Sequence, residues 1–105
     1  MRQYTTQYET ETLRTYGVVD PNYKLPFEPA NDEIGRAYSI GELINLLPRS
    51  IKDSGFTYQP QINRFGDVWC VAYTDDTLEL FACYDEELIR ALYDMTVNLK
   101  REGRI

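Results

Sequence analysis

The chain has 105 residues, of which 43% are hydrophobic and 27% charged, and this composition predicts one small folded domain rather than a disordered chain. It carries 17 acidic and 11 basic residues, and the net charge of -6 argues against direct nucleic-acid binding, which needs clustered positive charge. Histidine is absent, so the commonest general base and metal ligand is missing.

Neither a membrane span nor a secretory signal is expected. No segment approaches the roughly 20 consecutive apolar residues that a membrane-spanning helix needs. Residues 1–6 contain no apolar stretch of the kind found in signal peptides. The two cysteines are too few for a disulfide scaffold. We therefore expect a protein of the cytoplasm, its own or that of a host cell, with free thiols and no membrane partner.

The composition changes near residue 38 and divides the chain into two parts. Residues 1–38 contain three of the five prolines and five of the nine tyrosines, whereas most Leu, Ile and Val residues come later. We interpret residues 1–38 as an N-terminal arm, partly extended, and residues 39–105 as the core domain. Three prolines between residues 20 and 29 exclude a helix interior, so this part of the arm should be extended.

The beginning of the arm fits two structures. Thr6 and Glu9 have the spacing of a capping box, and Gly17 is placed to end a short helix. The same stretch is rich in Thr and Tyr, which equally favour a strand. Both structures remain open from the sequence.

A helix is predicted to start at Ser39, because Ser39 and Glu42 have capping-box spacing in front of a dense apolar face. Pro48 should end this helix or begin a second short turn that runs through Ile51. The apolar face consists of Leu43, Ile44, Leu46 and Leu47.

Three antiparallel strands are predicted next. From Phe56 the residues alternate between apolar and polar, and Pro60 favours an edge position for this strand. Gly66 and Asp67 form a two-residue turn, with Gly first as a type II′ turn requires. The second strand should span residues 68–74 and the third residues 78 to about 83. The turn predicts three cross-strand pairs: Phe65 with Val68, Arg64 with Trp69, and Ile62 with Val71.

The middle strand is apolar on both faces. Val71 and Tyr73 point to one face, while Cys70 and Ala72 point to the other. Such a sheet must be covered on both sides. The last helix can cover one, so we expect the arm, another helix or a second copy of the chain to cover the other.

The last helix is the clearest element of the pattern. Asp85 is its predicted N-cap, and Gly103 follows its end. The predicted fold class is therefore α+β: a helix, a three-stranded antiparallel sheet and a helix, with an N-terminal arm. The buried stripe of the last helix should consist of Leu88, Leu92, Met95 and Leu99.

Cys70 and Cys83 are candidates for chemistry. A tight turn near Asp76 would place them directly opposite each other on neighbouring strands, where they could bond or share a metal. Cysteine is, however, commonly a small buried hydrophobic residue. No Cys-x-x-Cys pair supplies the further ligands of a zinc site, and no basic neighbour in the sequence would activate either thiol. We therefore predict no metal, no cofactor and no catalytic residue.

Acidic residues dominate between Arg64 and Arg90, a stretch without Lys or Arg. Asp75, Asp76 and Glu79 are candidates for a negative edge that docks on a basic surface. The alternative is local, because turns and helix starts attract Asp and Glu for their own hydrogen bonding.

The tyrosines of the arm are the other interaction candidates. Tyrosine is enriched at protein interfaces, where it offers a large contact area with a polar tip. The alternative is that these rings pack on the protein's own core. The candidate anchors are Tyr4, Tyr8, Tyr16 and Tyr23.

Three segments together, Tyr38 to Pro48, Trp69 to Tyr73 and Glu87 to Tyr93, resemble small uncharacterised proteins encoded by phages, prophages and mobile elements of gut bacteria. The resemblance covers roughly the last two thirds of the chain and leaves out the arm. It implies an accessory protein that acts by contact, and it brings no catalytic residues with it.

These observations favour a non-enzymatic protein–protein interaction module. The expected partner is a host or phage protein or a second copy of the chain, in which case a homodimer results. The alternative from another class is a small enzyme or metal-dependent module that uses Cys70, Cys83 and nearby carboxylates.

Overall fold

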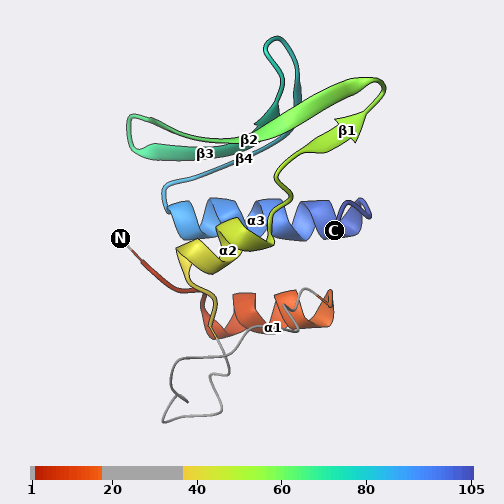
Figure 1. Cartoon of the computed structure of the whole chain (residues 1–105). Helices are drawn as coiled ribbons and strands as arrows, with labels where there is room; N and C mark the ends of the chain where they lie inside the picture. Colours follow the sequence, from red (N-terminus) through yellow and green to blue (C-terminus); the bar gives the residue numbers. More distant parts are fainter. Residues whose placement is uncertain (1, 18–36) are drawn as a thin grey trace.

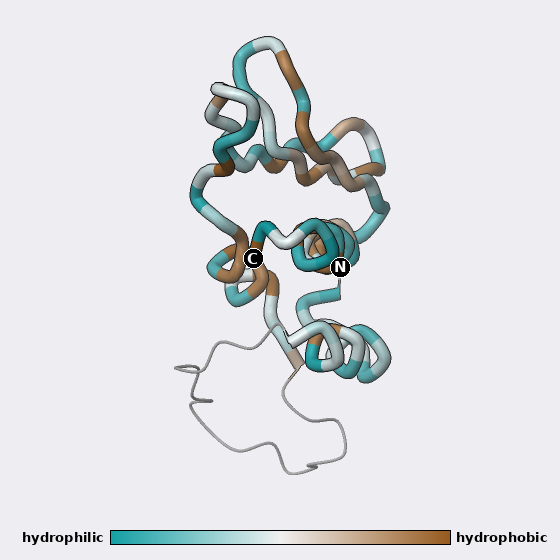
Figure 2. The backbone as a smooth tube through the Cα atoms, turned by 90° about the vertical axis from the view of Figure 1, so that its right-hand side faces the viewer, coloured by the Kyte–Doolittle hydropathy of each residue, from teal (hydrophilic) through white to brown (hydrophobic). Residues whose placement is uncertain are grey.

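The computed structural model describes residues 2–17 and 37–105 and arranges them in three layers (Figure 1). A four-stranded antiparallel sheet forms the first layer, helices α2 and α3 the second, and helix α1 the third; Figure 2 shows the same order from the side. The helices are α1 (Gln7–Thr15), α2 (Ile40–Leu46) and α3 (Leu88–Arg101). The strands, in sheet order, are β1 (Ile51–Asp53), β2 (Phe56–Phe65), β3 (Val68–Thr74) and β4 (Glu79–Asp85).

The predicted α+β class with an antiparallel sheet is confirmed, but the sheet has four strands instead of three. The additional strand, β1, pairs with the start of β2, with Ile51 opposite Tyr58. Helix α2 ends at Leu46, before Pro48, so the expected end of the helix is confirmed, and the alternative of a second short turn through Ile51 is wrong. A strand of three residues is too short to show alternation, so the sequence pattern carries no signal for it.

The arm begins with a helix, and the strand alternative is wrong. The Thr6 hydroxyl accepts a hydrogen bond from the Glu9 N–H (3.1 Å), and a Glu9 carboxylate oxygen accepts one from the Thr6 N–H (2.8 Å). This reciprocal pair satisfies two N–H groups that a helix start leaves unpaired. Gly17, with a φ of 74°, follows the end of α1 as predicted. The expected extended segment between residues 20 and 29, and Tyr23 within it, lie outside the described residues.

The capping box of α2 and the hairpin between β2 and β3 are confirmed. The Ser39 hydroxyl accepts a hydrogen bond from the Glu42 N–H (3.2 Å). Gly66 has a φ of 62°, which the first position of a type II′ turn requires. All three predicted cross-strand pairs occur: Phe65 with Val68, Arg64 with Trp69, and Ile62 with Val71.

The predicted pairing of Cys70 with Cys83 is wrong by one residue. Thr74 lies opposite Glu79, but Tyr73 lies opposite Phe81, so one extra residue enters β4 at this point. The shift places Cys83 opposite Val71 and Cys70 opposite Tyr84. Because a shift of one residue exchanges the faces of a strand, the two thiols lie on opposite faces of the sheet.

Helix α3 begins at Leu88 with Glu87 as its N-cap, so Asp85 is not the N-cap. Asp85 still pairs with Trp69 in the sheet, and the helix starts only after this ladder has ended. Its carboxylate instead accepts a hydrogen bond from the Glu87 N–H (2.9 Å). The predicted stripe is confirmed, since all its members are buried: Leu88, Leu92, Met95 and Leu99.

The described helices cover only one face of the sheet (Figure 1). On that face Val71 and Tyr73 are fully buried in the core together with α3. On the other face Cys70 and Ala72 are only 4% and 3% exposed, although no described helix lies over them. They are small, and longer side chains such as Tyr84 stand on the neighbouring strands. These two residues are therefore shielded from solvent without a second covering layer.

Candidate functional site

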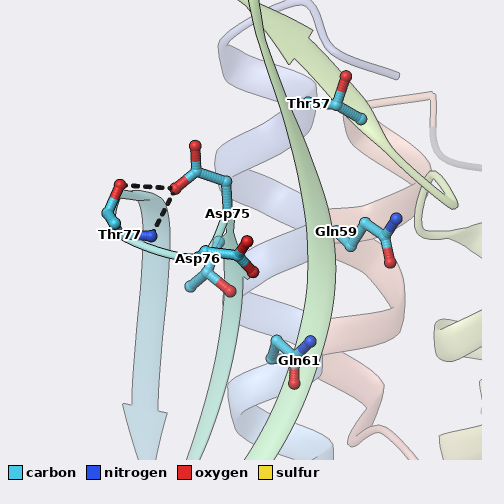
Figure 3. Close-up of a pocket in the computed structure, with 7 residues that line it drawn as sticks. Thr57, Gln59, Gln61, Asp75, Asp76 and Thr77 are labelled. Carbon is cyan, nitrogen blue, oxygen red and sulfur yellow. Dashed lines mark hydrogen bonds between the residues drawn. The ribbon is translucent and has the colours of Figure 1, made fainter.

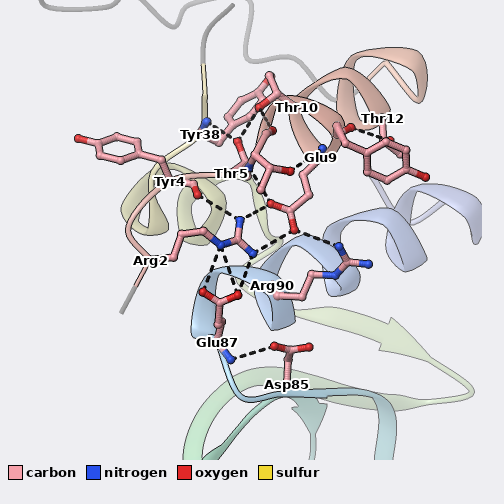
Figure 4. A network of polar contacts seen from close by, with 12 residues as sticks. Arg2, Tyr4, Thr5, Glu9, Thr10, Thr12, Tyr38, Asp85, Glu87 and Arg90 are labelled. Carbon is pink, nitrogen blue, oxygen red and sulfur yellow. Dashed lines mark hydrogen bonds and ion pairs between the residues drawn. The ribbon is translucent and has the colours of Figure 1, made fainter. Parts of the chain in front are cut away.

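A buried ion-pair network attaches α1 to the start of α3 (Figure 4). The Glu9 side chain is 1% exposed and accepts hydrogen bonds from both Arg2 and Arg90, the latter at 3.1 Å. Arg2 also forms an ion pair with Glu87 at 3.2 Å. A buried carboxylate requires such partners, because it loses its water shell on folding. The network therefore fixes the first residues of the chain against α3.

Hydroxyl groups continue this attachment toward α2. The Thr5 and Thr10 hydroxyls lie 2.7 Å apart, and the Thr5 hydroxyl accepts a hydrogen bond from the Tyr38 N–H at 2.9 Å. The Thr5 N–H donates to the Tyr38 carbonyl at 2.9 Å, and Tyr4 forms a β-bridge with Ser39. The arm residues on each side of the undescribed segment are thus bonded to each other.

Glu9 is ionised within this network. Burial alone would raise the pKa of Glu9, but hydrogen bonds from Arg2, the Thr6 N–H and Arg90 outweigh burial and lower the pKa below its ordinary value. Every acceptor direction of the carboxylate is used by the protein itself. Glu9 is therefore a structural residue and not a candidate acid or base.

A cleft of about 420 Å³ is lined by residues of α1, α3 and the end of β4, and four of them are tyrosines. We call it the tyrosine cleft. Tyr8 is 70% exposed, and Tyr93 is buried and forms part of the floor, whereas the ring of Tyr84, 57% exposed, lies on the outer face of the sheet beside Cys70. The further lining residues are Thr12, Tyr16, Cys83, Arg90, Asp94, Val97, Asn98 and Arg101.

Two arginines stack on tyrosines in the cleft. The Arg90 guanidinium lies 4.8 Å from the centre of the Tyr93 ring, and that of Arg101 lies 5.6 Å from the Tyr16 ring. Arg101 also donates a hydrogen bond to the Tyr16 hydroxyl (3.1 Å). Stacking of this kind holds a cation over an aromatic face. The cleft thus combines aromatic surface with positive charge on a chain that is acidic as a whole.

The single carboxylate of the cleft is already paired. Asp94 forms an ion pair with Arg90 at 3.1 Å. Burial raises the pKa of Asp94, while the neighbouring Arg90 opposes that shift. Arg101, in contrast, has no carboxylate within ion-pair distance among the residues described. The unneutralised charge of the cleft is therefore that of Arg101.

The cysteines offer no reactive thiolate. Burial, and after it the charge of Asp94, raise the pKa of Cys83 to about 11, so this thiol stays protonated near neutral pH. The Asn98 amide donates to the Cys83 sulfur at 3.3 Å. Cys70 is buried on the other face of the sheet, and both cysteines are free. Within residues 2–17 and 37–105 no cluster of three Cys, Asp or Glu side chains is arranged to hold a metal.

A second hollow, of about 490 Å³, lies on the outer face of the sheet between β2 and the loop after β3 (Figure 3). Asp75 and Asp76 line it opposite Gln59 and Gln61. The Asp75 carboxylate accepts hydrogen bonds from the N–H groups of Thr77 (2.8 Å) and Leu78 (2.7 Å). This favours the local interpretation of Asp75, since the turn itself uses that carboxylate.

The structure brings only some of the predicted anchors together. Tyr8 and Tyr16 share the tyrosine cleft, but Tyr4 is not among its lining residues, although it is 58% exposed. Asp75 and Asp76 line the outer hollow, whereas Glu79 does not.

Sequence reasoning missed the four aromatic and basic residues that β4 and α3 contribute to the lining of the cleft. On α1 the four-residue spacing of Tyr8, Thr12 and Tyr16 is a helical face that a firm helix prediction would have revealed. No sequence signal places that face beside β4. The missed residues are Tyr84, Arg90, Tyr93 and Arg101.

Comparison with protein-family models, curated proteins and solved structures finds no match. The resemblance to phage and mobile-element proteins therefore stays a prediction. Among the described helices, none has the length and apolar character to cross a membrane.

Proposed function

We propose that this protein is a non-enzymatic interaction module that holds a segment of a partner protein in the tyrosine cleft. The observation that carries the proposal is the pair of tyrosines on α1, the 70% exposed Tyr8 and the half-buried Tyr16, that line one cleft above a buried floor. Large aromatic rings left in water at a concave site gain free energy when a ligand covers them.

The side chains of the cleft suit binding. Tyrosine has few rotatable bonds, so immobilising it on binding costs little conformational entropy. The floor supplies apolar contact through Val97 and Tyr93, which are 7% and 5% exposed. Residues that dominate binding energy are typically buried at the centre of a contact, and the side chains around them exclude water.

The charge of the cleft indicates the chemistry of the partner. Arg90 and Asp94 neutralise each other, and Arg101 is the cation that lacks a carboxylate among the residues described. We infer a partner segment that carries a carboxylate next to an apolar side chain. The carboxylate would meet Arg101, and the apolar side chain would lie between Tyr8 and the floor at Val97.

The walls of the cleft are held in place before binding. Glu9, at 1% exposure, ties α1 to α3 through Arg90, which itself lines the cleft. A wall fixed in advance avoids the entropy cost of ordering a loop or helix on binding. This preorganisation supports a role in recognition.

Selection from a random peptide library on the immobilised full-length protein tests the proposal. Selected peptides should bind the wild-type chain and lose about tenfold or more in affinity to Tyr8→Ser and Tyr16→Ser, because each change removes a contact ring. Arg101→Gln should weaken acidic peptides and leave their uncharged counterparts unchanged. Binding is measured by isothermal titration calorimetry.

The matched control is Phe56→Ser, which removes a ring of similar exposure (45%) on the β1–β2 hairpin, away from the cleft. It should leave the affinity of the peptides unchanged. Peptides that bind Tyr8→Ser and Tyr16→Ser as well as wild type would overturn the proposal, and so would a library without any enriched ligand.

The alternative of a small enzyme or metal-dependent module has less support. It relied on Cys70 and Cys83 acting together, yet they lie on opposite faces of the sheet. The raised pKa of Cys83 also disfavours a nucleophilic thiolate at neutral pH.

A further inference from the structure

Strand β2 is exposed along most of its length. Of its ten residues, only Tyr58 is buried. β1 pairs with Phe56 to Tyr58 and then ends, so no described strand pairs with β2 on that side over residues 59–65. An unpaired strand edge offers N–H and C=O groups that another strand can bond.

The two neighbouring turns determine which backbone groups point to this free edge. Gly66 and Asp67 form a two-residue turn, so Phe65 and Val68 exchange hydrogen bonds, and the backbone groups of Phe65 point toward β3. Direction alternates along a strand, so the backbone groups of residues 60, 62 and 64 point away from β3. The two-residue turn between Asp53 and Phe56 leads to the same result. It directs the backbone groups of Phe56 toward β1, and the alternation along β2 then directs those of residues 60, 62 and 64 to the same side.

We propose that two copies of this chain associate by antiparallel pairing of this edge, with Ile62 opposite Ile62 of the second copy. Ile62 is the midpoint of the free stretch 59–65. Pairing centred on Ile62 places residue 65 of one copy opposite residue 59 of the other, next to the residues of β2 that pair with that copy's own β1. In this register the two Ile62 residues exchange N–H to C=O bonds. The Arg64 N–H donates to the Pro60 C=O of the second copy. Proline can take part in this bond because it acts only as the acceptor.

The side chains of the stretch are compatible with a second copy. Two chains that each carry a net charge of -6 repel, yet residues 59–65 contain no acidic residue and a single charge, Arg64. In the proposed register Arg64 lies opposite Pro60 and away from its counterpart. Ile62, 38% exposed, would be covered by its own symmetry mate.

Proline and charged residues on a strand edge often prevent that edge from pairing with another strand. Here neither blocks the centre of the free stretch 59–65. Pro60 stands at one end of the stretch and not at Ile62. The Arg64 guanidinium lies 5.5 Å from the Trp69 ring, and its Nε donates to the Gly66 carbonyl at 3.0 Å. The charged group is thus held over the sheet and not beyond its edge.

Sedimentation equilibrium of the full-length protein over a concentration series tests the proposal. Wild type should show a monomer–dimer equilibrium, and Ile62→Pro should weaken it by about tenfold or more, because it removes the central N–H. That N–H has no hydrogen-bond partner among residues 2–17 and 37–105, so the fold should persist in circular dichroism. The control Ile62→Ala keeps the N–H and should retain a measurable dimer.

Cross-linking gives a readout that does not depend on the proline variant folding. A directly opposed, hydrogen-bonded pair has Cα atoms about 5.5 Å apart, which a disulfide can bridge. Ile62→Cys should therefore form a covalent dimer on mild oxidation, and Lys52→Cys, exposed on β1, should not. A wild-type chain that stays monomeric at millimolar concentration, or equal cross-linking of both variants, would overturn the proposal. Either result would leave the proposed ligand of the tyrosine cleft unaffected.

Discussion

Glu9 is the residue on which the position of the arm depends. It is buried to 1% exposure and paired with two arginines, Arg2 and Arg90, which are themselves partly exposed. Removing one partner of a buried pair leaves the remaining charges uncompensated. Because both arginines can regain water, the loss should fall at the low end of the range for buried pairs.

Glu9→Gln should lower the free energy of unfolding by about 3 kcal/mol at pH 7. The loss should shrink in acid. The pKa of Glu9 is lowered in the folded state, so its stabilising contribution is complete above the ordinary glutamate pKa and disappears as the pH falls through the folded value. Urea unfolding of both proteins between about pH 7 and pH 2 measures the difference in the free energy of unfolding between wild type and Glu9→Gln.

Glu11→Gln is the matched control, because Glu11 lies on the same helix but is exposed. Its free energy of unfolding should stay within about 0.5 kcal/mol of wild type at every pH. A Glu9→Gln gap that is constant with pH, or equal to that of Glu11→Gln, would contradict the assigned role of the carboxylate.

Helix α1 belongs to the core by its packing. Leu13 is fully buried in the same hydrophobic cluster as Leu92 and Leu99 of α3. Leu13→Ala should cost about 3 kcal/mol of unfolding free energy, because it deletes buried methyl groups and leaves a cavity. Chemical denaturation followed by circular dichroism measures this change.

The control for Leu13→Ala is Leu78→Ala, since Leu78 is 45% exposed in the turn before β4. Its cost should stay near 0.5 kcal/mol. If Leu13→Ala has no larger effect than Leu78→Ala, α1 does not unfold together with the sheet and α3.

The elements that sequence reasoning predicted well are those with local causes. The capping box at Ser39 and the turn at Gly66 each depend on residues within a few positions of one another. The elements that it placed wrongly depend on distant partners. Asp85 resembles an N-cap, but its pairing with Trp69 on β3 keeps it in the sheet.

At the scale of the whole molecule, net charge opposes the proposed self-association. Two copies at -6 repel over long range, while the paired stretch itself carries little charge. Raising the salt concentration from about 0.05 M to about 0.5 M shortens the screening length and should tighten the dimer. Sedimentation equilibrium at both salt concentrations measures the change, and a dimer that weakens with salt would instead indicate ion pairs in the interface.

The candidate site belongs to this largest scale as well. Tyr8 and Tyr16 were candidates from the sequence because exposed tyrosine is common at interfaces. Their neighbours Tyr93 and Arg101 come from a segment more than seventy residues away, and only the docking of α1 on α3 joins them.

The sequence by itself determined the α+β class, the capping box at Ser39, the β2–β3 register and the buried stripe of α3, because each follows from neighbouring residues and from the period of a helix or strand. The tertiary structure decided the register of β4, the short strand β1 and the tyrosine cleft. One extra residue in β4 separates Cys70 from Cys83, and one buried carboxylate, Glu9, brings α1 to α3. Both effects depend on contacts between segments far apart in the chain, and the hydrophobic periodicity of the sequence contains no information about such contacts.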